Sequence, residues 1–321
     1  MKNLRVVFMG TPEFAVATLG SLLINGYDVA GVVTAPDKPA GRGRKITKSP
    51  VKIFAESHYL PLKQPDSLKD PSFIDWLARM NPDVFVVVGF RMLPETVWKI
   101  PGTVTINLHA SLLPQYRGAA PINHVIINGE TVTGVTTFII NDKIDTGYIL
   151  LREEIRICPF ENAGELHDRL MKHGARLVIK TLQGLAENKL KPKPQSQFML
   201  PGEILKTAPK IFPEDCIINW NDDTQKIHNL IRGLAPHPGA RTLLIKKSSS
   251  LTFKVFESQI ENAEHTLIPG QIVSDGKTFI KVACKSGFII ILQLQPEGKK
   301  KMSSQEFLNG FRISDYSISV N

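Results

Sequence analysis

The alternation of apolar and polar positions predicts that the chain begins with strands and helices in turn. Apolar runs at 4–9 and 29–34 flank a helical pattern at 13–24, and such a β-α-β unit indicates a parallel sheet. Pro12 suits the first turn of this helix, because the backbone donor that proline lacks would be unpaired there. The nearly uninterrupted apolar run at 83–88 is typical of a strand covered on both faces. We therefore expect an α/β fold with a Rossmann-like, mostly parallel sheet.

The pattern changes character near residue 189. Residues 189–206 contain Lys-Pro-Lys-Pro and Leu-Pro-Gly, which favour a stiff, extended linker. A helix at 224–234 is followed by short apolar runs with glycine or charged turns between them, at 242–245, 251–258, 270–274, 279–283 and 288–295. Such a series is typical of a small β-barrel. The sequence therefore predicts a first domain at 1–188, a linker at 189–206 and a second domain at 207–321.

Composition narrows the class of protein. The three cysteines are far apart and lack CxxC spacing, so neither a disulfide framework nor a structural zinc site is expected, and no other metal cluster is visible. No apolar run approaches the length that crosses a bilayer, and we expect a cytoplasmic protein without a membrane partner. The net charge of +9 favours a polyanionic partner.

Much of the excess charge lies in one segment. Between Asp37 and Lys52 there are six basic residues and one acid, and the proline and glycine content predicts an exposed loop. The run Gly41-Arg42-Gly43-Arg44 lets backbone and guanidinium groups approach an anion closely, because glycine adds no steric bulk. A solvated loop with scattered charge is the alternative.

The candidate chemistry lies at the end of the apolar run 104–106. Asn107 and His109 are two residues apart, so on a strand they share one face. Together they can hold a carbonyl oxygen whose negative charge grows during attack. Asp145, in an Asp-Thr-Gly turn, can orient the imidazole and stabilise its protonated form. The set suits acyl transfer to an amine, although a structural role would also explain His109 taken alone.

Longer motifs identify a relationship. Ser111-Leu112-Leu113-Pro114-x-Tyr116-Arg117-Gly118, together with Asn107, His109 and the Asp-Thr-Gly turn, resembles the signature of the folate-dependent formyltransferases. The segments 9–15 and 37–44 narrow this resemblance to members that formylate methionyl-tRNA. It covers essentially the whole chain. It implies an OB-like second domain that binds tRNA, 10-formyltetrahydrofolate as co-substrate and initiator methionyl-tRNA as partner, in translation initiation. We expect a monomer.

The resemblance also implies roles for single residues. Asn107 and protonated His109 would hold the tetrahedral oxyanion, and Asp145 would help to move the amine proton through water. The folate would border Phe90, Arg91, Met92, Leu93, Ser111, Leu112, Leu113, Pro114, Ile140 and Asp142. The tRNA acceptor stem would contact Lys38, Arg42, Arg44, Lys45 and Lys48. Ser111 lacks a G-x-S-x-G elbow, so a cap of the turn before Leu112 explains it better than a nucleophile does.

Three other functions compete with this one. A formyltransferase acting on a small amine, such as glycinamide ribonucleotide or an amino sugar, would share the site but would need neither the basic loop nor a second domain. A nucleotide-dependent oxidoreductase is disfavoured because G-x-G-x-x-G is absent. A noncatalytic RNA-binding protein would leave Asn107, His109 and Asp145 unexplained.

Overall fold

The computed structural model describes residues 4–40, 45–246 and 249–318. The chain forms two compact units, and both are discontinuous in sequence. The first comprises Met1–Gly118, Val132–Arg156 and His167–Thr207, and the second comprises Ala119–Thr131, Ile157–Leu166 and Ala208–Asn321. Two segments of the predicted first domain, 119–131 and 157–166, thus pack with the C-terminal residues.

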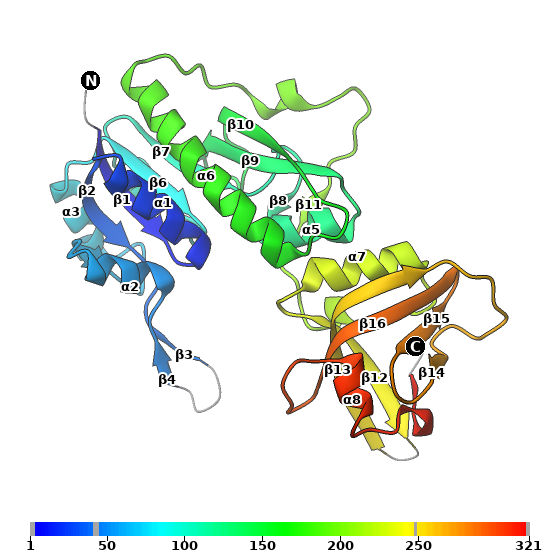
Figure 1. Ribbon diagram of the computed structural model, residues 1–321. Helices are drawn as coiled ribbons and strands as arrows, with labels where there is room; N and C mark the ends of the chain where they lie inside the picture. The colour runs from blue at the N-terminus through cyan, green and yellow to red at the C-terminus, as the bar shows by residue number, and fades with distance from the viewer. Residues whose placement is uncertain (1–3, 41–44, 247–248, 319–321) are drawn as a thin grey trace. The chain divides into compact units, whose positions relative to one another are not determined.

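The first unit is built on a seven-stranded sheet in the order β10-β9-β7-β6-β1-β2-β5 (Figure 1). These strands are β1 (Arg5–Gly10), β2 (Asp28–Val33), β5 (Leu62–Lys63), β6 (Val84–Val88), β7 (Val104–His109), β9 (Val132–Ile139) and β10 (Ile149–Arg156). The pairs from β7 to β5 are parallel, whereas β9 and β10 add antiparallel neighbours at one edge. The predicted mostly parallel α/β sheet is confirmed.

Helices α1 (Glu13–Ile24), α2 (Pro50–Ser57), α3 (Pro71–Arg79), α4 (Glu95–Trp98) and α6 (Ala163–Ala186) connect or follow these strands. Local sequence sets where two of them begin. The Ser49 hydroxyl accepts a hydrogen bond from the Lys52 amide at the start of α2, and the Asp70 carboxylate accepts one from the Ser72 amide at the start of α3. Each cap is followed by a proline in the first helical position, where no backbone donor is needed.

The basic segment after β2 contains more regular structure than the sequence predicts. Strands β3 (Lys38–Ala40) and β4 (Lys45–Thr47) pair antiparallel, with Lys38 opposite Thr47. In Figure 1 this ribbon extends away from the sheet of its unit. Its base is held by an ion pair of 2.6 Å between Lys52 Nζ and Asp37 Oδ2. Residues 41–44 lie outside the described residues.

Residues 189–206, expected as a linker, lie along the first unit. The Lys193 amide donates to the Ile149 carbonyl at 2.9 Å, and the Ile149 amide donates back to the Lys193 carbonyl at 2.8 Å. Lys193 stands between Pro192 and Pro194, which keep the backbone extended and suit it to this bridge beside β10. A short 3₁₀ turn at Gln195–Phe198 follows.

The second unit is an antiparallel barrel-like sheet, which confirms the predicted barrel. Its strand order is β14-β15-β16-β13-β12-β18, and β17 pairs with β16. The strands are β12 (Ala240–Lys246), β13 (Ser249–Glu261), β14 (Ile272–Ser274), β15 (Ile280–Cys284), β16 (Gly287–Pro296), β17 (Met302–Ser303) and β18 (Ser317–Ile318). Helix α8 (Ser304–Leu308) and the 3₁₀ turns Glu214–Cys216 and Ile313–Asp315 also belong to this unit, whereas β8 (Arg117–Gly118) lies in the first unit and β11 (Thr207–Ala208) lies at the boundary between the units in sequence.

Two early segments of the chain complete the second unit. Helix α5 (Pro121–Ile127) packs on α7 (Thr224–Leu234), where the Asn123 amide donates to the Gly233 carbonyl at 2.7 Å. A Cβ on Gly233 would lie only 2.6 Å from Ile127, so glycine is what allows this close approach. The Arg232 guanidinium donates to the Glu161 carbonyl at 3.1 Å and ties 157–166 to the same helix.

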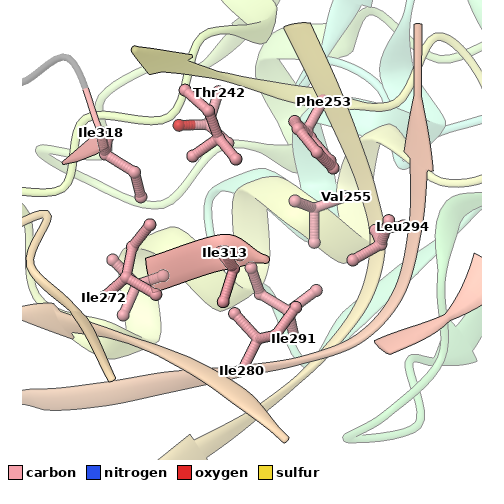
Figure 2. Close-up of a pocket in the computed structure, with 11 residues that line it drawn as sticks. Thr242, Phe253, Val255, Ile272, Ile280, Ile291, Leu294, Ile313 and Ile318 are labelled. Atoms are coloured by element: carbon pink, nitrogen blue, oxygen red, sulfur yellow. The ribbon is translucent and has the colours of Figure 1, made fainter. Parts of the chain in front are cut away.

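The interior of the barrel is filled with apolar side chains. Figure 2 shows Phe253, Val255, Ile280 and Ile291 pointing toward one another around a cavity of about 20 Å³. A water molecule fits such a volume but needs two or more polar partners. Among the described residues that line it, only Thr242 is polar, and its hydroxyl already accepts a hydrogen bond of 3.0 Å from the Trp220 indole. The barrel interior is therefore a packed core and not a ligand chamber.

The register of β9 generates a test of the first unit. A Cβ on Gly134 would overlap the Glu153 carbonyl oxygen of β10 and the Leu112 side chain. We expect Gly134→Ala to lower the free energy of unfolding by about 3 kcal/mol, because the backbone oxygen cannot move aside without breaking the pairing of β9 with β10. Gly102→Ala is the matched control: its Cβ would lie 3.9 Å from the Pro82 carbonyl oxygen, an ordinary contact, and we expect a change within about 0.5 kcal/mol. Urea titration of both variants checks this, and equal midpoints would contradict it.

Candidate active site

Strand β7 carries two of the three predicted catalytic residues near the centre of the sheet. Asn107 lies opposite Val87 of β6 and Phe138 of β9, and His109 lies opposite Thr136 of β9. Because they are two residues apart on one strand, their side chains leave the same face. His109 is buried and Asn107 is half-buried. This arrangement agrees with the spacing argument from the sequence.

The imidazole of His109 has an acceptor near each ring nitrogen. Nε2 lies 2.9 Å from the Tyr116 carbonyl oxygen, and Nδ1 lies 3.7 Å from Asp145 Oδ2. A neutral ring carries one N–H donor, whereas a protonated ring carries a donor on each nitrogen. The second distance exceeds that of a normal hydrogen bond. The Nδ1 side of the ring therefore faces the carboxylate across a gap.

The loop after β7 holds the Tyr116 carbonyl in place. The Ser111 hydroxyl is fully buried and donates to the Gln115 carbonyl at 2.6 Å. The Thr136 hydroxyl of β9 donates to the Ser111 carbonyl at 2.7 Å and accepts from the Leu113 amide at 3.2 Å. Ser111 thus closes its own turn, in agreement with the structural interpretation of this residue.

Asp145 is presented by a turn with little freedom. The Asn141 side chain accepts from the Lys143 amide at 3.1 Å and from the Thr146 hydroxyl at 3.0 Å. Asp145 adopts a φ of 53°, in the left-handed region that aspartate tolerates better than most residues. A Cβ on Gly147 would overlap the Ile139 carbonyl, which explains the glycine of the Asp-Thr-Gly turn. The Gly118 amide donates to Asp145 Oδ2 at 3.0 Å.

Two further residues join the site, Gln195 and Arg117, to which the sequence analysis assigned no role. Gln195 is only 5% exposed, and its Nε2 donates to the carbonyls of Asp145 and Gly147 at 2.8 and 2.9 Å. The Arg117 guanidinium donates to Gln195 Oε1 through Nε at 3.1 Å and Nη2 at 2.6 Å. Burial lowers the pKa of the Arg117 guanidinium, and the nearby Asp145 carboxylate opposes that shift. Arg117 belongs to the signature motif, but a single glutamine in an extended segment gives no comparable signal.

The candidate folate residues divide by exposure. Leu93 is buried, and half-buried Phe90 and Ile140 pack against the same apolar cluster. Arg91 donates to the carbonyls of Pro65 and Asp66 and lies 5.7 Å from the centre of the Phe90 ring.

Other members of this set differ in what they offer a ligand. Met92 and Asp142 are exposed, Leu112 is half-buried, and Pro114 is buried. Leu113 is fully buried with Phe138 and Ile149, so its side chain serves the core and a ligand would reach only its backbone.

The candidate tRNA residues lie on and beside the ribbon β3–β4. Lys38 is exposed, and Lys45 begins β4. Lys48 pairs with Glu56 at 2.7 Å, and this hydrogen bond raises the pKa of the Lys48 ammonium. Part of the positive charge is therefore matched locally. Arg42 and Arg44 lie outside the described residues.

Two kinds of feature are absent from the described part of the chain. Within residues 4–40, 45–246 and 249–318, no group of three or more His, Cys, Asp or Glu side chains is arranged to hold a metal ion. None of the helices described in those ranges is long and apolar enough to cross a membrane.

Comparison with known structures supports the fold. An N-formyltransferase from Helicobacter canadensis, in complex with folinic acid and dTDP-3-aminofucose, superposes with a TM-score of 0.64 at 20% identity and covers 93% of this chain and 100% of that one. HypX from Aquifex aeolicus, in complex with tetrahydrofolic acid, gives a TM-score of 0.63 at 18% identity and covers 96% of this chain and 47% of that one. At such low identity these similarities concern the fold alone.

Comparison of sequences goes further. Residues 3–182 match the family described as formyl transferase, and residues 210–312 match its C-terminal domain. Methionyl-tRNA formyltransferase of Bacteroides fragilis is 50% identical over 98% of this chain and 97% of its own, and that of Flavobacterium johnsoniae is 51% identical over 98% of both. The resemblance seen in the sequence motifs is confirmed, and the chain belongs to the formyl transferase family, among the methionyl-tRNA formyltransferases.

Proposed function

We propose that this protein transfers the formyl group of 10-formyltetrahydrofolate to the α-amine of methionine esterified to initiator tRNA, as a step of translation initiation. The observation that carries the proposal is identity of about 50% to methionyl-tRNA formyltransferases over nearly the full length of both chains. The paired His109 and Asp145 supply chemistry that this reaction needs. We expect the protein to act as a monomer in the cytoplasm.

The residues proposed to border the folate suit a flat, partly apolar ligand. Half-buried Phe90 and Ile140 pack against one apolar cluster, and Met92, two residues after Phe90, is 62% exposed. Asp142 is an exposed carboxylate that can accept hydrogen bonds from ring nitrogens. When bound, the folate supplies the activated formyl group.

Attack of the neutral amine on the formyl carbon produces a tetrahedral oxyanion, and two side chains of β7 stabilise it. The half-buried Asn107 amide is one donor. The Nε2 of His109 is committed to the Tyr116 carbonyl, so the Nδ1–H of the protonated ring is the second. Fixed donors of this kind stabilise charge as it develops because they need no reorientation during the reaction.

Asp145 has two tasks in this mechanism. Its carboxylate lies 3.7 Å from His109 Nδ1 and orients the ring, and it accepts the proton that the amine loses, through a water molecule. The Gly118 amide fixes Oδ2 and leaves the other oxygen for the proton transfer. The oxyanion then collapses, the bond between the formyl carbon and the folate nitrogen breaks, and that nitrogen takes the proton from Asp145 as tetrahydrofolate leaves. No covalent enzyme intermediate is required.

The amino acceptor is proposed to be tRNA because of the basic ribbon and the second unit. A small amine would require neither, whereas phosphates attract lysine and arginine without regard to sequence. The packed barrel interior means that the second unit would use its outer surface for tRNA.

The function is tested by measuring formyl transfer from 10-formyltetrahydrofolate to charged initiator tRNA, with charged elongator tRNA and small amines as competing acceptors. We expect initiator methionyl-tRNA to be formylated with the highest kcat/KM. Preferred formylation of glycinamide ribonucleotide or an amino sugar would overturn the proposal.

His109→Ala and Asp145→Asn should each lower turnover by roughly two to three orders of magnitude, because each removes a group that acts on charge formed during the reaction. Folate and tRNA binding should change little. Half-buried His167 and exposed Asp168, whose Nδ1 and Oδ1 are 3.0 Å apart, offer matched controls: His167→Ala and Asp168→Asn should retain turnover. Near-normal single-turnover rates in the two site variants would remove the assignment.

Variants of the basic segment can distinguish general attraction of tRNA phosphates from recognition of the initiator acceptor stem. Arg42 is flanked by glycines, so its planar guanidinium can enter a groove or reach base edges. We expect Arg42→Ala to narrow the preference for initiator over elongator acceptor stems, whereas Lys38→Ala should weaken all tRNAs alike and flatten the salt dependence of binding. The ratio of kcat/KM values and the salt slope are measured for both variants. If Arg42→Ala only flattens the slope, the arginine is one more phosphate contact.

A further inference from the structure

The turn that presents Asp145 is held from behind by a residue far away in sequence. Gln195 follows Pro194 in the segment beside β10 and points its carboxamide at the backbone of the turn. We propose that Gln195, oriented by Arg117, is a positioning residue that sets the place of the Asp145 carboxylate relative to His109. This inference rests on the proposed function, because it assigns a role toward the same reaction.

Every hydrogen-bonding group of the Gln195 carboxamide is used. Its oxygen accepts two hydrogen bonds from the Arg117 guanidinium, at 3.1 and 2.6 Å. Its nitrogen donates to the Asp145 carbonyl at 2.8 Å and to the Gly147 carbonyl at 2.9 Å. Since Arg117 can only donate, it forces the carboxamide oxygen toward itself and the nitrogen toward the turn. Arg117 therefore selects the one orientation of Gln195 that serves the turn.

The two carbonyls fix the backbone on both sides of Thr146. Asp145 has a φ of 53°, a region that a residue with a Cβ occupies at a cost unless its surroundings hold it there. The Gln195 amide supplies that restraint from one side. On the other side, the Gly118 amide holds Asp145 Oδ2 at 3.0 Å. The backbone and the carboxylate of Asp145 thus have separate anchors.

Two adjacent residues, Arg117 and Gly118, hold both the backbone and the carboxylate of Asp145 in place. The Arg117 side chain holds Gln195, and the next backbone amide, that of Gly118, holds the carboxylate. The guanidinium hydrogen bonds go to a neutral carboxamide. A direct ion pair with Asp145 would stabilise the carboxylate and make it a poorer proton acceptor. Because Gln195 lies between them, the Arg117 guanidinium fixes the position of the Asp145 turn without a direct hydrogen bond to the carboxylate.

The experiment compares Gln195→Leu with Gln197→Leu in the full chain. Gln197 lies in the same 3₁₀ turn but is exposed, so it controls for loss of a glutamine there. We expect Gln195→Leu to lower kcat roughly 10- to 100-fold, the range expected for a small displacement of a catalytic group, with KM for folate and tRNA within about threefold. Gln197→Leu should match the unsubstituted protein.

A double-mutant cycle with Asp145→Asn separates positioning from general structural support. If Gln195 acts through Asp145, the effect of Gln195→Leu on kcat should fall below about threefold in the Asp145→Asn background, because residues that act as a unit are not additive. An equal factor in both backgrounds would overturn the proposal. Arg117→Lys keeps the charge but loses the planar fork, and we expect a smaller fall in kcat than for Gln195→Leu.

A readout independent of activity keeps this test separate from the proposed function. Hydrogen exchange of the Gly118 amide reports whether Asp145 Oδ2 still accepts its hydrogen bond. We expect faster exchange at Gly118 in Gln195→Leu, and unchanged exchange in Gln197→Leu, with equal melting temperatures for the two. Unchanged exchange at Gly118 would contradict the positioning role even if the protein formylated a different amine. Absence of formyl transfer by the unsubstituted protein would instead refute only the proposed function.

Discussion

The pairing of β7 on both of its edges is the constraint on which the site depends. Parallel β6 and antiparallel β9 hold this strand in register, so its alternate side chains must leave opposite faces. Leu108 leaves one face and meets α6 where Gly174 has no side chain, since a Cβ there would lie 2.8 Å from Leu108. Asn107 and His109 are consequently fixed on the other face. The polar residues are placed by the packing of the apolar residue between them.

Much of the fold and part of the site could be predicted from local patterns. Helix α1 begins and ends where the periodicity predicts, and the apolar run at 83–88 contains β6. The pair Asn107 and His109 follows from the two-residue repeat of a strand, which needs no knowledge of distant residues. The strands of the barrel could also be predicted from the sequence, because short strands and the turns between them depend on local residues.

The remainder depends on contacts between distant residues. Gln195 reaches residues about fifty positions earlier, and nothing around it in the sequence marks it as buried. Proline residues around Lys193 predicted an extended segment correctly, but extension alone does not distinguish a free linker from a strand-like partner of β10. The grouping of 119–131 and 157–166 with the C-terminal residues likewise depends on tertiary packing. Local propensity and hydrophobic periodicity do not indicate which distant segments pack together.

The discontinuous second unit has a consequence for how the chain is made. Helix α5 packs Ile127 against the apolar core of the second unit and meets α7, about one hundred residues later. At roughly 5 to 20 residues per second of synthesis, α5 leaves the ribosome roughly 5 to 20 seconds before its partner helix. The sheet of the first unit can form before segment 119–131 is packed, because β7 and β9 pair without it. The second unit is thus completed late in translation. Until then the apolar side chains of α5 that will contact α7 are exposed to solvent, where chaperones can bind them and aggregation can begin.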